Sequence, residues 1–231
     1  MALYLDTPLF GVTISIIAFI IGIYMSKKTK IAIINPLVVS YIIIISFLLY
    51  FNIDYEIYNK GGSIISFFIA PATVVLAVPL YKNIKLLKER WPSILIGITL
   101  GSLAGLFSIF LMSKIFKIDD IVMLSLFPKS TTAAISMEIA DQIGGIPALA
   151  VAFTAVTGIV GNFMGDYIFK LFKIKDKVSR GVALGTASHA LGTAKAMEMG
   201  ETEGALSSLA ITVAGIISVF LIPWFIKILS I

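Results

Sequence analysis

The sequence predicts an all-α, polytopic integral membrane protein, and three observations carry this prediction. Of the 231 residues, 58% are hydrophobic and only 13% are charged, whereas soluble domains have about 45–50% apolar and about 25% charged residues. The mean hydropathy is +1.02. The apolar residues are gathered in charge-free stretches of roughly the 20 residues that a helix needs to cross a bilayer. This composition excludes an ordinary soluble globule, and it also excludes an intrinsically disordered chain.

Basic residues are gathered in the short segments that separate the apolar stretches. The clusters lie within Lys27–Lys30, Lys82–Arg90 and Lys170–Arg180, and the net charge is +5. In multi-pass proteins such loops face the cytoplasm and anionic lipid. The charge therefore indicates a cell membrane, plasma or inner, and nucleic acid is not an expected partner.

Five stretches are long and clean enough to be spanning helices, and three more are interrupted. The clean stretches are Thr7–Ser26, Ile31–Ile53, Trp91–Ser113, Gln142–Gly165 and Gly204–Ile226. The interrupted stretches are Gly61–Tyr81, which contains Pro71 and Pro79, Ile121–Met137, which contains Pro128 and Lys129, and Gly181–Ala194, which contains His189.

The first stretch is predicted to be a retained helix. A signal peptide has positive charge before its apolar core, but here Asp6 precedes the core and Lys27, Lys28 and Lys30 follow it. This order favours an N-terminus outside the cell, and no cleaved targeting segment is expected.

The chain has the pattern of an inverted repeat with halves at residues 1–117 and 118–231. Each half reads helix, helix, broken segment, helix, and matching loops carry opposite charge, as expected for halves of opposite orientation. Each half must then cross the membrane an odd number of times. Re-entrant segments at residues 61–81 and 181–199 satisfy that count but place the basic cluster Lys82–Arg90 outside. Whether these two segments cross or re-enter is therefore left open.

Breaks in membrane helices are the best sequence pointer to the binding site of a transporter. Pro128 ends a helical turn because it removes a backbone donor, and a new half-helix is expected over Ala133–Ile139. Its N-terminus offers free N–H groups and partial positive charge, and Lys129 adds a full charge. The hydroxyls expected to cap this half-helix and to bind a small carboxylate with Lys129 belong to Ser130, Thr131 and Thr132. The alternative places Lys129 in a loop, with its side chain extended to the interface.

The other two breaks supply further candidate groups. Pro71, Thr73, Ser188 and His189 are further candidate substrate-binding residues. Thr73 and Ser188 would supply neutral hydrogen bonds, and the alternative for His189 is a satisfied polar residue of the core. The small residues around Ser188 are also explained by close helix packing.

Three ionisable groups are candidates for proton or cation coupling. They are Glu138, Asp166 and His189, whose ordinary pKa lies near neutrality. The alternatives are that Glu138 faces water and that Asp166 is interfacial. Lys195 and Glu198, three residues apart, are expected to pair as helix neighbours.

Enzyme motifs are missing from the sequence. There is no cysteine and only one histidine, and the chain lacks HExxH, GxSxG and a Walker loop. Ser188 and His189 are adjacent, so they do not make a triad. We therefore expect no enzyme activity, no cofactor and no metal.

Four blocks of sequence carry a family resemblance. They are Leu126–Thr132, Ile143–Pro147, Gly185–Ala194 and Glu203–Ala210, with further agreement at Pro71–Tyr81. With these blocks the chain resembles the LrgB/CidB family over nearly its whole length. One departure is that the family usually reads Pro-Lys-Ser-Val-Thr-Thr-Pro-Ile where this chain continues with Thr131, Thr132 and Ala133. Asp166 is a second, since a proline or apolar residue is expected there.

The resemblance implies two functional hypotheses. One is an antiholin- or holin-like regulator of murein hydrolase export and autolysis. The other is a carrier of small monocarboxylates such as pyruvate or glycolate, as for relatives that resemble pyruvate carriers and the plant plastid glycolate/glycerate carrier. The broken helices and Lys129 favour transport. The expected partners are a small LrgA/CidA-like membrane protein, a small carboxylate and the lipid bilayer, with a homo-oligomer left open.

Overall fold

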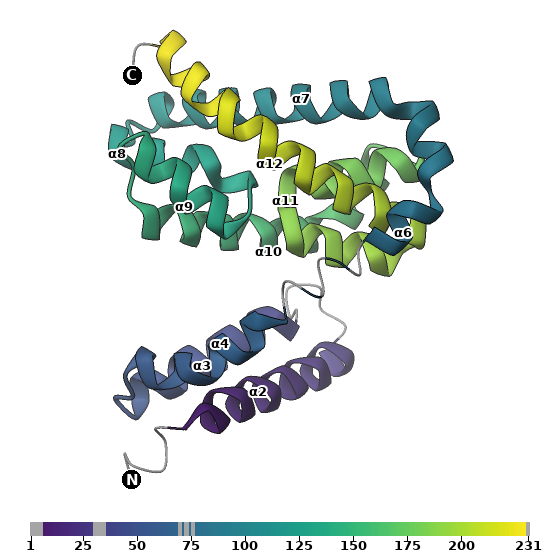
Figure 1. The fold of residues 1–231 in the computed structure, drawn as a ribbon. Coiled ribbons are helices and arrows are strands. Elements are labelled where there is room, and N and C mark those ends of the chain that lie inside the picture. The colour runs from purple at the N-terminus through teal and green to yellow at the C-terminus, as the bar shows by residue number, and fades with distance from the viewer. Residues whose placement is uncertain (1–6, 30–35, 69–70, 72–73, 75–76, 230–231) are drawn as a thin grey trace. The chain divides into compact units, whose positions relative to one another are not determined.

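A computed structural model describes residues 7–29, 36–68, 71, 74 and 77–229 of the chain. Every element within them is a helix (Figure 1). The elements are α2 (Pro8–Thr29), α3 (Pro36–Tyr50), α4 (Tyr55–Phe67), α6 (Ala77–Lys82), α7 (Ile84–Ile115), α8 (Asp120–Leu126), the 3-10 turn η1 (Phe127–Ser130), α9 (Ala133–Gln142), α10 (Pro147–Leu171), α11 (Lys177–Met199) and α12 (Glu201–Leu229). They form two compact units, Met1–Val75 and Leu76–Ile231.

In the first unit, α2 packs against both α3 and α4. Gly11 of α2 and Gly61 of α4 lie so close that a Cβ on either would overlap the other helix. A hydrogen bond of 3.0 Å joins Ser15 to the hydroxyl of Tyr58, and the Asp54 side chain caps α4. Small residues thus allow the close helix approach that packing in lipid requires.

The second unit is organised around α12, which lies along α11 and α7 (Figure 1). One core cluster joins Ile94 and Ile98 of α7 to Leu206 of α12. Another joins Phe127 of η1 to Phe225 of α12, whose ring centroids are 5.8 Å apart. The short elements α8, η1 and α9 are therefore part of the packed interior of this unit.

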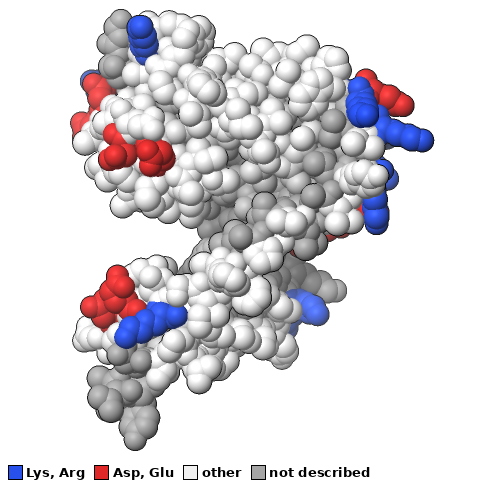
Figure 2. All heavy atoms as spheres, viewed as in Figure 1, with Lys and Arg blue, Asp and Glu red and all other residues white. Residues whose placement is uncertain are grey.

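The helices have the length and apolarity of membrane-spanning helices. Four of them are long and apolar enough to span a bilayer: α2, the Lys88–Ile115 part of α7, α10 and α12. Large apolar side chains are exposed along these helices. Figure 2 shows charged side chains near the helix ends and a surface without charge between them. This agrees with the predicted spans, although the part of Ile31–Ile53 that is described as helix is the shorter α3, Pro36–Tyr50.

Both breaks predicted in the second unit are present. Helix α8 ends at Leu126, the chain passes through η1, and α9 begins at Ala133. Helix α11 is interrupted at His189, whose φ of 41° and ψ of −131° are not helical. The third predicted break, around Pro71–Thr73, lies in part outside the described residues.

The break at His189 folds α11 back on itself. A straight helix separates residues 184 and 192 by about 12 Å, yet a Cβ added to Gly192 would overlap the carbonyl oxygen of Leu184. Leu184 also shares a core cluster with Ala196. The two arms of α11 therefore run antiparallel, and His189 lies at the tip between them.

The compact units do not coincide with the predicted halves 1–117 and 118–231. The reason is that α7 packs against α11 and α12, which joins it to the later part of the chain. Compactness is a different property from internal symmetry, so the inverted repeat and the path of the broken segments through the bilayer stay predictions.

Candidate functional site

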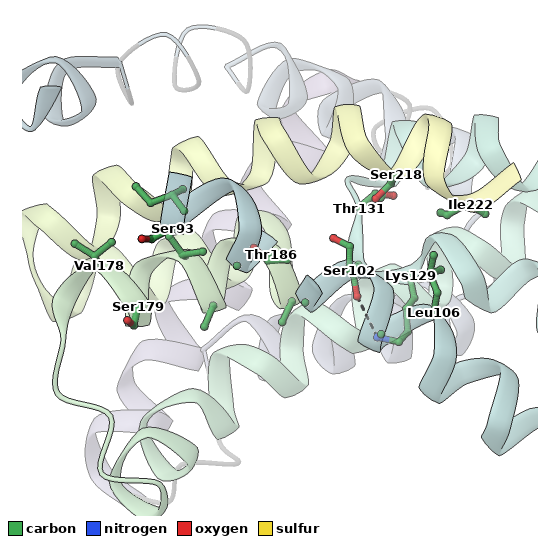
Figure 3. Close-up of a pocket in the computed structure, with 18 of the residues that line it drawn as sticks. Ser93, Ser102, Leu106, Lys129, Thr131, Val178, Ser179, Thr186, Ser218 and Ile222 are labelled. Atoms are coloured by element: carbon green, nitrogen blue, oxygen red, sulfur yellow. Dashed lines mark hydrogen bonds between the residues drawn. The ribbon is translucent and has the colours of Figure 1, made fainter. Parts of the chain in front are cut away.

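A cavity of about 660 Å³ lies within the second unit, between α7, η1, α11 and α12 (Figure 3). This volume is in the range of small-molecule sites. Charged groups occur at both ends of the cavity: Glu89, Arg90 and Asp176 lie at the start of α7 and α11, and Lys129 lies beside Ser102 and Leu106. Ser102 is at the middle of the Lys88–Ile115 span of α7, so the Lys129 end is the deep end.

Lys129 reaches the cavity because η1 turns the chain at this point. Phe127 and Pro128, just before it, are buried in the core. The Lys129 ammonium donates a hydrogen bond of 3.1 Å to the Ser130 hydroxyl, drawn as a dashed line in Figure 3. Within the described ranges, no carboxylate lies within ion-pair distance of it. A cation inside a membrane protein normally has a counter-charge, so this ammonium is suited to bind an anion.

The three hydroxyls after Lys129 have different roles. The Thr132 side chain caps α9 by accepting a hydrogen bond of 3.4 Å from the Ile135 N–H. The buried Thr131 hydroxyl donates to the carbonyl oxygen of Pro128 at 2.7 Å. Thr132 is thus the cap that the sequence predicts, whereas Ser130 and Thr131 line the cavity beside Lys129.

Glycines of α7 give the cavity its width. A Cβ added to Gly97 or Gly105 would meet no atom within 4 Å, and one added to Gly101 would lie 3.6 Å from the Thr186 methyl group. In contrast, Gly181 and Gly185 of α11 lie directly against the backbone of α12. The glycines of α11 therefore allow close packing against α12, as expected from the sequence. The glycines of α7 leave open space in the cavity.

Ser188 and His189 lie at the tip of α11, packed against α10. The His189 ring is 6% exposed, and its Nε2 lies 2.8 Å from the Thr154 carbonyl oxygen. The buried Ser188 faces Gly161. Neither residue lines the cavity, whereas Thr186 and Ala187 just before them do. This position fits the alternative of a satisfied core histidine.

The remaining predicted residues lie elsewhere. Glu138 is exposed and accepts a hydrogen bond from Gln142. Asp166 forms an ion pair of 2.9 Å with Lys195, which also pairs with Glu198 at 3.3 Å as its spacing predicts. Pro71 belongs to the first unit, and Thr73 lies outside the described residues.

An ion pair marks the outer end of the cavity. Arg90 of α7 and Asp176 lie 3.1 Å apart. Asp176 also caps α11, accepting hydrogen bonds of 2.8 Å from the backbone N–H and from the hydroxyl of Ser179. These bonds, the backbone one foremost, and then the charge of Arg90 hold the pKa of Asp176 below its ordinary value.

Several residues that line the cavity have no distinctive signal in the sequence. Arg90 and Asp176 are far apart in the chain, so their pairing has no local signal, although Asp176 followed by Ser179 is a helix-start pattern. The unpredicted hydroxyls of the inner cavity belong to Ser102, Thr186 and Ser218. Serine and threonine are common in membrane helices as packing residues, and only the fold shows which of them face a cavity.

Comparison with known proteins gives one consistent result. The model of the LrgB-like family matches residues 15–228. The chain is 41% identical over 220 residues to the "Antiholin-like protein LrgB" of Bacillus cereus (strain B4264), which covers 95% of this chain and 96% of the relative. The same figures hold for the protein of that name in Bacillus anthracis (strain CDC 684 / NRRL 3495). No solved structure matches significantly.

Proposed function

The chain belongs to the LrgB-like family, and from this premise we propose that it is a multi-pass cell-membrane transporter of small monocarboxylates of the pyruvate or glycolate type. The observation that carries the proposal is the Lys129 ammonium. It lies at the deep end of a cavity, is held by a break between helices, and has one hydrogen-bond partner among the described residues, the neutral Ser130 hydroxyl.

The charges around the cavity favour one carboxylate. Arg90 and Asp176 form an ion pair at the outer end, where Glu89 also lies, and Lys129 is the charge at the inner end among the described lining residues. A single carboxylate balances this ammonium, whereas a dicarboxylate would bring a second charge with no partner, at high cost in a low-dielectric site. The carboxylate accepts hydrogen bonds from the Lys129 ammonium and the Ser130 hydroxyl.

The packing of the deep end favours alternating access over an open pore. The η1 turn contacts α7, α10, α11 and α12, so Lys129 lies where several helices meet. Helix ends and broken segments at such a junction are typical of transporter sites. Of the three predicted coupling groups, His189 is the one that is buried at a break, and we retain it as the group for coupling to protons.

Uptake into vesicles tests the proposal. The purified protein is reconstituted with and without its LrgA-like partner, and the uptake of labelled pyruvate and glycolate is measured against concentration. We expect saturable uptake that falls at least about tenfold in Lys129→Met, because a hydrogen bond to a charged group is worth about 1.5–3 kcal/mol. Lys170→Met, which removes an exposed lysine of α10, is the matched control and leaves uptake unchanged.

The names of the relatives support a second candidate function. Both Bacillus proteins are called antiholin-like, and this suggests a regulator of murein hydrolase export and autolysis that acts with an LrgA-like protein. In the same vesicles that function predicts release of dyes of either charge, without saturation and without dependence on Lys129. Saturable, Lys129-dependent uptake of one class of acid would exclude it as the primary activity.

A further inference from the structure

The long helices of the second unit and the α11 hairpin meet at a common end. The Arg90–Asp176 ion pair of 3.1 Å joins the start of α7 to the start of α11, and a short connection joins the end of α10 to the same point. Gly181, one turn into α11, lies against the carbonyl oxygen of Glu203 in the first turn of α12. The start of α12 is therefore at this end as well.

Basic residues are distributed unequally between the two ends of this unit. Three of them, Lys114, Lys117 and Lys227, lie at the end where α7 and α12 finish, and Lys129 lies between the ends. We call the other end the basic end, and its members are Lys82, Lys85, Lys88, Arg90, Lys170, Lys173, Lys175, Lys177, Arg180 and Lys195. In Figure 2 most of the blue side chains of this unit lie at the end where α7 begins. In multi-pass proteins an excess of Lys and Arg marks the cytoplasmic side.

The cavity is accessible at the basic end and closed toward the opposite end. Beyond Lys129 its floor contains Leu106, Phe127 and Ile222, each at most 5% exposed. These three side chains belong to a core cluster of α7, α8, η1, α9 and α12, which fills the space between the cavity and the end where α7 finishes. The lining residues at the basic end are exposed, and they are Glu89, Arg90, Asp176 and Ser179.

Two chain reversals approach the middle of this unit from opposite ends. The α11 hairpin enters from the basic end and turns at His189. Helix α8 begins at the other end, where Lys114 and Asp120 form an ion pair of 3.6 Å, and the chain turns at η1 and returns in α9 to the start of α10. The η1 turn contacts α11. Non-helical backbone at membrane depth is tolerated where it is buried in protein or lines a cavity, and both turns meet this condition.

We propose that the basic end faces the cytoplasm, that α8–α9 and α11 re-enter the membrane from opposite sides, and that this structure is the state in which Lys129 is accessible from the cytoplasm. An acid then travels about 18 Å along α7, from Arg90 to the level of Ser102, to reach the ammonium group. Access from the opposite side requires the core cluster at the floor to separate. The inference deepens the proposed transport function and rests on it for the identity of what enters the cavity.

Single cysteines test this inference, because the chain has no cysteine of its own. Lys175→Cys reports on the basic end, and Asp141→Cys, near the end of α9, reports on the opposite end; both residues are exposed. Ser102→Cys reports on the cavity beside Lys129. An impermeant, anionic methanethiosulfonate is added to intact cells or to inside-out vesicles, in the absence of any transported acid. The thiols that remain are then counted with a maleimide after denaturation.

We expect Lys175→Cys and Ser102→Cys to lose their thiols in inside-out vesicles and to keep them in intact cells. Asp141→Cys is the matched control and shows the reverse pattern. If Ser102→Cys does not accumulate, Ala187→Cys on the α11 wall of the cavity takes its place, and the same pattern is expected.

Modification of Lys175→Cys in intact cells would overturn the orientation. Modification of the cavity cysteine in intact cells, or its protection in both preparations, would overturn the assignment of a state open to the cytoplasm. The labelling needs no transport, so its result and the result of the uptake experiment are independent. Saturable uptake with the wrong sidedness refutes this inference alone, whereas the expected sidedness without uptake refutes the proposed function.

Discussion

The Nε2 atom of His189 lies 2.8 Å from the backbone carbonyl oxygen of Thr154. The contact joins the tip of α11 to the middle of α10, and it is possible because residue 158, one turn further along α10, is glycine. A Cβ on Gly158 would lie 2.5 Å from Cε1 and 2.9 Å from Nε2 of the ring. The imidazole thus occupies the space that a side chain on α10 would need.

Gly158→Ala is expected to destabilise the protein by about 1–3 kcal/mol, the usual cost of overpacking a filled interior. The added methyl group displaces the His189 ring from Thr154, so the proton dependence of uptake changes as well. Thermal unfolding in detergent measures the first effect. Gly97→Ala, where an added Cβ meets open space, is the control and does not lower the melting temperature. Equal melting temperatures for both variants would contradict the packing described for His189.

Gly105→Ala is expected to separate cavity shape from stability. Alanine stabilises a helix by about 1 kcal/mol relative to glycine, and the methyl group enters open space in the cavity. The variant therefore melts no lower than the unmodified protein. Its uptake of a four-carbon acid relative to glycolate is lower than the same ratio in the unmodified protein. Gly62→Ala in α4, where an added Cβ meets nothing closer than 3.5 Å, controls for the helix effect. Unchanged selectivity in Gly105→Ala would show that cargo does not reach α7.

Lys129→Met is expected to lower uptake without lowering stability. A lysine within an apolar stretch costs about 2.5–3.5 kcal/mol on insertion scales, and here no carboxylate among the described residues offsets that cost. Methionine fills similar space without charge, so the melting temperature stays the same or rises. A large fall in melting temperature would mean that Lys129 supports the fold and would weaken its assignment to cargo.

Asp176→Ala is expected to destabilise the protein at neutral pH by about 0.5–2 kcal/mol, the usual cost of losing a helix N-cap. The pKa of Asp176 is lowered in the folded protein. Its contribution to folding stability is therefore fully present above the ordinary aspartate pKa, and it is lost as the pH falls through the lowered pKa of the folded state. The difference in melting temperature between variant and unmodified protein therefore shrinks below pH 3.8, the ordinary value. Asp119→Ala is the control, because the Asp119 side chain makes no cap hydrogen bond in α8. A pH-independent difference would contradict the role of the carboxylate.

The sequence predicted those features of the fold that depend on local chemistry. Long apolar stretches predicted α2, α7, α10 and α12, because the bilayer imposes a minimum length on a spanning helix. Pro128 predicted the end of α8 because proline disrupts a helix wherever it stands in the interior. Thr132 was predicted, with its neighbours, as a cap of α9 from hydroxyl chemistry alone.

The cavity was not predictable in the same way, because its walls come from distant segments. Thr186 and Gly101 have no relationship in the sequence, and only the packing of α11 on α7 brings them together. Asp166 illustrates the same limit. Read alone it is a candidate for coupling, but the fold places the ammonium group of Lys195 2.9 Å away.

The reversal of α11 at His189 determines which residues share an aqueous compartment. Because its two arms run side by side, Lys177 and Glu198 lie at the same end of the hairpin, and we expect both to face the same side of the membrane. The chain has no cysteine, so Lys177→Cys and Glu198→Cys each introduce a unique thiol for an impermeant maleimide. When the reagent is added outside sealed vesicles, it is expected to modify either both positions or neither of them.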